Sequence, residues 1–125
     1  MDWMERQFVP AAEAMPEQKF FWAPTNGAFH GVRNFAQQLL HVAEVNFALS
    51  SAILGESSAT GGPAEAMKTR SGIIQYLKNS FANTHRAFSS ITEENANLPI
   101  KHPLFEMVTT RMGLAIVAIA HPFDH

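Results

Sequence analysis

The chain of 125 residues contains no cysteine. Without cysteine there can be no disulfide framework, no zinc finger, no iron–sulfur ligation and no cysteine nucleophile. Any protein ligand to a metal ion must therefore come from histidine, aspartate or glutamate. A domain of this length can bury a sufficient core without disulfides or a structural metal, so a bound metal would be functional.

The sequence also lacks an excess of basic residues. It has 9 Lys and Arg residues against 11 Asp and Glu residues, a formal net charge of -2, and no basic run. The electrostatic footprint of a protein that binds duplex nucleic acid is therefore missing, and no nucleic-acid partner is expected.

Long apolar runs are missing as well. The longest, residues 112–120, is far shorter than the roughly 18 residues that a membrane-spanning helix needs, so no membrane partner is expected. The N-terminus carries charges of both signs and no apolar segment with a small-residue cleavage site, so no secretory signal is expected. Together with the lack of cysteine, these features predict a cytoplasmic protein.

Alternation with a period of two residues is also absent, and the sequence predicts an all-α fold without strands. Apolar residues recur at helical spacing in residues 1–15, where Pro10 predicts a kink or two shorter helices. A second helix is predicted over residues 34–54, with Asn34 and Gln37 as a capping pair and Gly55 as its end. Its nearly all-apolar surface predicts the most buried helix of the set.

Two further helices complete the expected fold. The third is predicted to start at Pro63 and to reach about Ser90, weakened slightly by Gly72. The fourth is predicted to begin near Pro103 and to run into the C-terminal histidines. The predicted architecture is a four-helix bundle in a single domain, and such bundles build metal sites from inward-facing side chains on neighbouring helices.

The connections between these helices are expected to differ in character. Residues 55–63 are rich in glycine and serine and are predicted to form the most mobile loop. Residues 93–103 are also predicted to be a loop. Phe20, Phe21 and Trp22, in the first connection, are expected to plug one end of the core rather than to stack on a ligand.

Two C-terminal histidines, His121 and His125, suggest chemistry most directly. Residues four apart in a helix share a face, so the two imidazoles could bind one metal ion. His41, in the second predicted helix, is the candidate for a third ligand, and three imidazoles with an open position would form a catalytic type of site. Spacing alone leaves an alternative, in which the C-terminal pair is solvated or in the core and His41 is hydrogen-bonded to a carbonyl, to Gln37 or to Gln38.

The other histidines are assigned no chemistry. His85 is expected at the surface, and His30 and His102 are expected in loops or as capping residues. Glu44 and Asp124 are candidates to orient an imidazole or to accept a proton from a metal-bound water. The C-terminal motif is not His-Glu-x-x-His, which disfavours peptide hydrolysis.

Two segments resemble those of a known family. Residues 33–46, RNFAQQLLHVAEVN, resemble the second-helix signature of DinB-like proteins, the DinB/YfiT superfamily. Residues 110–125, TRMGLAIVAIAHPFDH, resemble the family's fourth helix, and the resemblance covers the whole chain. It implies a four-helix bundle with up-down-down-up topology and a divalent metal ion, commonly nickel or zinc, held by three histidines at the positions of His41, His121 and His125.

The resemblance also implies a range of functions. The superfamily includes thiol-dependent S-transferases and a mycothiol-dependent isomerase, and homodimers are common in it. We therefore expect a metal-dependent enzyme, either a transferase or a hydrolase, that acts on a small-molecule substrate such as a low-molecular-weight thiol. The competing hypothesis is a non-catalytic, metal-binding or stress-associated structural dimer. Neither hypothesis assigns a catalytic residue.

Two features depart from the family pattern. Pro122 lies between the two C-terminal histidines, where it should bend the helix and change the aim of the imidazoles. Family members also continue beyond the position of His125 with a helical tail. Because the last turn of a helix frays readily, we expect either that the natural chain continues past His125 or that this chain binds metal more weakly than a longer one.

Overall fold

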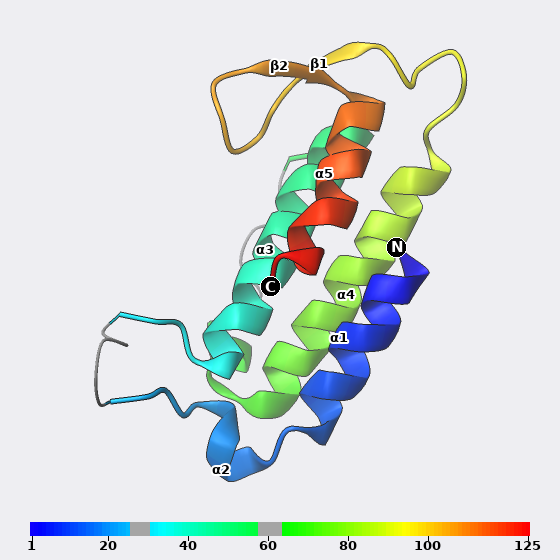
Figure 1. Cartoon of the computed structure of the whole chain (residues 1–125). Helices are drawn as coiled ribbons and strands as arrows, with labels where there is room; N and C mark the ends of the chain where they lie inside the picture. Colours follow the sequence, from blue (N-terminus) through cyan, green and yellow to red (C-terminus); the bar gives the residue numbers. More distant parts are fainter. Residues whose placement is uncertain (26–30, 58–63) are drawn as a thin grey trace.

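The computed structural model describes residues 1–25, 31–57 and 64–125, and it is mainly helical. Its elements in chain order are α1 Asp2–Ala14, α2 Glu17–Phe20, α3 Phe35–Leu54, the 3-10 helix η1 Ala66–Lys68, α4 Arg70–Ser89, β1 Pro99–Lys101, β2 Val108–Thr110 and α5 Arg111–Phe123. In Figure 1 the four long helices lie along one another, with α3 and α4 running upward and α1 and α5 running downward. The predicted helical class is therefore confirmed, whereas the prediction of no strands is wrong.

Helix α3 has the bounds that its caps predict. The side chain of Asn34 accepts a hydrogen bond from the backbone N–H of Gln37, and the Gln37 side chain accepts one from the backbone N–H of Asn34. At the other end Gly55 adopts a left-handed conformation, with φ of 72°, which glycine reaches without steric strain. Eleven buried residues make α3 the most buried of the described helices, as its composition predicts.

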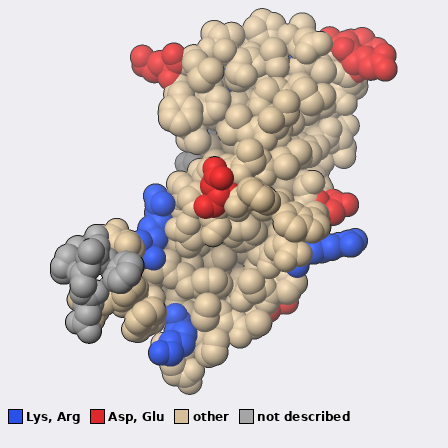
Figure 2. All heavy atoms as spheres, viewed as in Figure 1, with Lys and Arg blue, Asp and Glu red and all other residues tan. Residues whose placement is uncertain are grey.

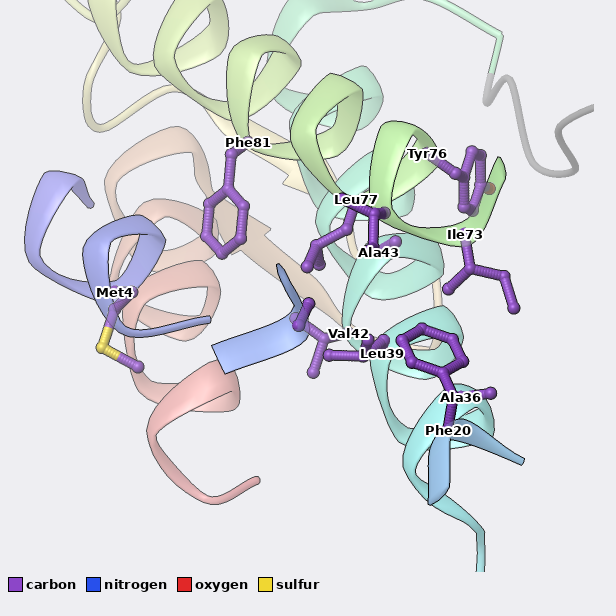
Figure 3. Packing of buried hydrophobic residues seen from close by; sticks show 12 residues of the cluster. Met4, Phe20, Ala36, Leu39, Val42, Ala43, Ile73, Tyr76, Leu77 and Phe81 are labelled. Carbon is purple, nitrogen blue, oxygen red and sulfur yellow. The ribbon is translucent and has the colours of Figure 1, made fainter. Parts of the chain in front are cut away.

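The core consists of two groups of apolar side chains that meet along α3. One group lies between α1, α2, α3 and α4, and Figure 3 shows Leu77 and Phe81 of α4 pointing toward the side of α3 that carries Leu39 and Val42. The other group joins the second half of α3 to α4 and α5 and includes Leu114. Because both groups use α3, this helix fixes where α5 lies relative to α1. No helix in the described ranges is both long enough and apolar enough to cross a membrane.

The first helix is continuous, although Pro10 predicted a kink or two shorter pieces. Helix α1 extends through Pro10 to Ala14. Proline cannot donate a hydrogen bond to the carbonyl of Arg6, but both residues are exposed, so water can satisfy that carbonyl. The short α2 follows and was not predicted.

The aromatic residues around the end of α2 divide into two groups. Phe20 is fully buried and packs edge-on against Phe35, with their ring centroids 5.5 Å apart, so it plugs the core as predicted. Phe21 and Trp22 are 45% and 57% exposed, which contradicts the same prediction for them. Only the first of the three aromatic residues therefore contributes to the core.

The third long helix starts later than predicted. Pro63 and most of the loop predicted to be mobile, residues 58–63, lie outside the described residues. Helix α4 begins at Arg70, capped by the Thr69 side chain, which accepts a hydrogen bond from the backbone N–H of Gly72 over 3.1 Å. The preceding turn η1 folds back so closely that a Cβ on Gly72 would overlap the carbonyl oxygen of Ala66. Gly72, expected only to weaken the helix, is therefore required for this turn.

The fourth long helix also starts later than predicted. Residues near Pro103 belong to a hairpin, in which Ile100 of β1 pairs with Thr109 of β2 in an antiparallel register. Helix α5 begins at Arg111, after Thr110 caps it by accepting a hydrogen bond from the backbone N–H of Gly113 over 3.0 Å. The prediction failed because strands of three residues are too short to show alternation, and their apolar residues fit a helical period equally well.

Candidate metal centre

Three histidines from two distant parts of the sequence meet between α3 and the C-terminus. His41 lies on α3, His121 lies near the end of α5, and His125 is the last residue. Figure 1 shows the C-terminus beside the first half of α3. The structure therefore brings together all three residues that the sequence singled out as metal ligands.

The facing atoms of these rings are their Nε2 nitrogens. Nε2 of His121 lies 3.2 Å from Nε2 of His41 and 3.2 Å from Nε2 of His125. One ligand atom from each of the three histidines can be chosen so that all lie within 4.8 Å of one another. The rings meet edge to face, with centroids 4.6–5.0 Å apart, so they converge instead of stacking.

These separations match those of ligands around a metal ion. Imidazole nitrogens about 2.0–2.1 Å from a tetrahedral zinc ion lie about 3.3 Å from one another. Two of the three Nε2 pairs in this chain are 3.2 Å apart. Three neutral imidazoles that converge on one point suit a first-row divalent ion, and the side chains present fit such a group.

Hydrogen bonds alone cannot pair all the ring nitrogens that face one another in this cluster. A ring nitrogen carries either one hydrogen or one lone pair, yet Nε2 of His121 faces two other nitrogens at the same distance. In addition, Nδ1 of His121 is buried and has no hydrogen-bond partner among the described residues. The three Nε2 atoms therefore face one another with more contacts than hydrogen bonds can link, and a shared cation would satisfy their lone pairs together. Nδ1 of His121 would then carry the ring's hydrogen.

The local environment favours the neutral form of two of the rings. Burial lowers the pKa of His121 to about 4, with smaller contributions from His125 and His41. Burial also lowers the pKa of His41, followed by the positive charge of Arg33 and by His125. Since only a neutral imidazole can bind a metal ion, both shifts prepare the rings for coordination.

Gln38 contacts a different histidine from the one that the sequence-based alternative named as its possible partner. Its side-chain amide lies within hydrogen-bond distance of Nδ1 of His125, not of His41. If the amide is turned so that its oxygen accepts the Nδ1 hydrogen, Nε2 of His125 keeps its lone pair for a metal. Gln38 precedes His41 by three residues on the same face of α3, and that spacing is the signal that could have identified it.

The end of α5 departs from the expected geometry without losing the cluster. The helix passes through Pro122, which is buried, and ends at Phe123, so His125 lies just beyond it. The backbone N–H groups of Asp124 and His125 donate to the carbonyls of His121 and Pro122, each over 3.2 Å. This tight last turn carries His125 back toward the other two rings.

The remaining candidates lie away from the cluster or do not contact it. Glu44 and Asp124 are exposed, and within the described residues neither carboxylate hydrogen-bonds one of the three rings. His85 bridges α4 and α1, with Nε2 2.8 Å from a Glu5 carboxylate oxygen. His102 is buried in the hairpin, where its Nδ1 accepts a hydrogen bond from the backbone N–H of Leu104 over 3.2 Å. His30 lies outside the described residues.

A cavity of about 350 Å³ opens beside His125, between α1, α3 and the end of α5. Its walls are mostly apolar and aromatic, and Gln7, Gln38 and His125 supply the polar groups. A mostly apolar hollow with a few convergent polar groups is typical of a small-molecule site. The histidine cluster therefore adjoins a space that could hold a substrate.

Comparison with known proteins supports the resemblance noted in the sequence. No curated protein matches the chain in sequence. The family model described as the DinB superfamily matches residues 1–125. This match covers both segments that carry the three histidines, and the chain belongs to the DinB superfamily.

Proposed function

We propose that this protein is a metal-dependent enzyme that uses His41, His121 and His125 to hold one divalent ion. The observation that carries the proposal is the convergence of the three Nε2 atoms, with two separations of 3.2 Å. Nickel and zinc are the proposed ions, because both accept neutral imidazole ligands. A bound ion with an open position would act as a Lewis acid and lower the pKa of a water or thiol ligand toward about 7.

The side chains around the cluster have separate proposed roles. Gln38 holds the ring of His125 through Nδ1. The cavity beside His125 binds the apolar part of a small molecule and excludes water from it. The proposed reactions are transfer of a group to or from a low-molecular-weight thiol, or hydrolysis.

Elemental analysis and metal titration test this proposal. Protein prepared without a histidine tag should bind one nickel or zinc ion per chain, and His41→Ala should abolish tight binding because it removes a ligand from the preformed site. His102→Ala is the matched control, since that histidine is buried in the hairpin away from the cluster. Absence of binding by the unaltered chain after addition of either ion would overturn the proposal.

The alternative function is a non-catalytic structural dimer, and the surface of α5 supports it. Met112, Ile116, Ile119 and Phe123 of α5 are all exposed, with exposed fractions between 44% and 72%. Figure 2 shows an uncharged surface over α5 and the hairpin, with acidic groups at its edges. Two copies related by a two-fold axis could bury this stripe against itself without placing like charges together, so a homodimer is proposed for either function.

A further inference from the structure

A second cavity adjoins the one beside the histidines. It has a volume of about 510 Å³ and lies between α2, the segment after it and the start of α3. Lys19, Trp22 and Arg33 line it, and it shares Phe35 and Gln38 with the apolar cavity. The two hollows therefore meet at the side chain that contacts His125.

This second cavity carries two positive charges without an acidic partner. Within the described residues, neither Lys19 nor Arg33 takes part in an ion pair with a carboxylate. The sequence between α2 and α3, residues 21–34, includes no acidic residue. The acidic residue of α2, Glu17, lies beside a different cation, with its carboxylate 4.0 Å from Nε of Arg70.

Lys19 contacts a neighbouring ring, and the chain beside Arg33 is held by a hydrogen bond, although both basic side chains are exposed. The Lys19 ammonium lies 5.4 Å from the centre of the Trp22 ring, a favourable cation–π contact. The Asn34 side chain donates to the Phe21 carbonyl over 3.3 Å and so ties the end of α2 to the start of α3, next to Arg33.

We infer that Lys19 and Arg33 bind the anionic group of an amphiphilic small molecule whose apolar part fills the cavity beside His125. This inference rests on the proposed function and names its class of substrate. A guanidinium pairs with a carboxylate through two parallel hydrogen bonds, and the ammonium adds a second charge. The apolar part would contact Phe8, Phe35 and Phe123.

The two tryptophans of the chain make the inference measurable. Trp3 lines the apolar cavity and Trp22 lines the basic one. The probes are 4-phenylbutyrate and its neutral amide, titrated into metal-free protein while the two indole N–H signals are followed by proton–nitrogen NMR. The carboxylate should shift both signals, and the amide should bind about tenfold more weakly, as expected for the loss of a charge-assisted hydrogen bond.

Matched variants separate the charge effect from loss of structure. Lys19→Gln and Arg33→Gln should each weaken binding of the carboxylate about tenfold, whereas Lys101→Gln on β1 should leave it unchanged. Equal affinity for the acid and the amide, or a Trp22 signal that does not move, would overturn the inference. Carboxylate binding to a chain that takes up no nickel or zinc would refute the metal proposal alone. Metal uptake without carboxylate binding would refute this inference alone.

Discussion

The Nε2 atoms of His41 and His121 lie 3.2 Å apart, although 80 positions separate the two residues in the chain. The pair is held by the packing of α3 against α5. Val45, one turn after His41, and Ala118, one turn before His121, belong to the same buried cluster. A small residue at Ala118 lets the two helices approach closely, so the core that stabilises the fold also sets the distance between the ligands.

Gln38 should tune the metal site without being a ligand. We expect Gln38→Ala to weaken nickel or zinc binding about 10–100-fold, the range typical for loss of a group that orients a ligating histidine. Gln38→Glu should retain tight binding, because a carboxylate can accept the Nδ1 hydrogen of His125. Calorimetric titration of both variants provides the measurement. Equal affinities for the alanine variant and the unaltered chain would show that His125 needs no such support.

The metal-free protein should lose stability as the pH falls. The pKa of His121 is about 4 in the folded chain and about 6.5 in an unfolded one. Between these values the unfolded chain binds more protons, so the free energy of unfolding should decrease from about pH 6.5 and level off below about pH 4. Urea unfolding in the presence of a chelator measures this. His121→Asn should reduce the loss across this window, and an identical loss would show that other groups cause it.

Gly72→Ala should destabilise the fold more than the intrinsic helix preference suggests. Alanine normally favours a helix over glycine by about 1 kcal/mol, but here the new Cβ would overlap the backbone carbonyl oxygen of Ala66. We expect a net loss of about 1–3 kcal/mol, because the η1 turn has to move. Ser71→Ala, at the exposed neighbouring position, is the control and should change stability little. A more stable Gly72→Ala protein would refute the close approach of η1 to α4.

The exposed stripe on α5 should mediate self-association. Ile116 is 61% exposed, so Ile116→Glu should not unfold the monomer. In a two-fold dimer, the same substitution would place two negative charges in an apolar contact and should prevent association. Sedimentation at micromolar concentration should therefore give a dimer for the unaltered chain and a monomer for Ile116→Glu. Gln75→Glu, on an exposed position of α4, should remain dimeric. A monomeric unaltered chain would rule out the dimer.

Some features follow from the sequence alone because their causes are local. The ends of α3 depend on side chains within three residues of the backbone groups that they cap, so Asn34, Gln37 and Gly55 define that helix without reference to the rest of the fold. The choice of His41, His121 and His125 needed helical spacing and the family resemblance. Helical spacing also identified α4 and α5, although it placed the start of each too early.

Other features were decided only by tertiary structure because their causes are non-local. The hairpin of β1 and β2 depends on pairing across the chain, such as Ile100 with Thr109, and three-residue strands carry no periodic signal of their own. The partner of Gln38 depends on where α5 ends after Pro122. The separation of 3.2 Å between the Nε2 atoms of His41 and His121 depends on how closely two helices distant in sequence pack, which only the shape of the assembled core determines.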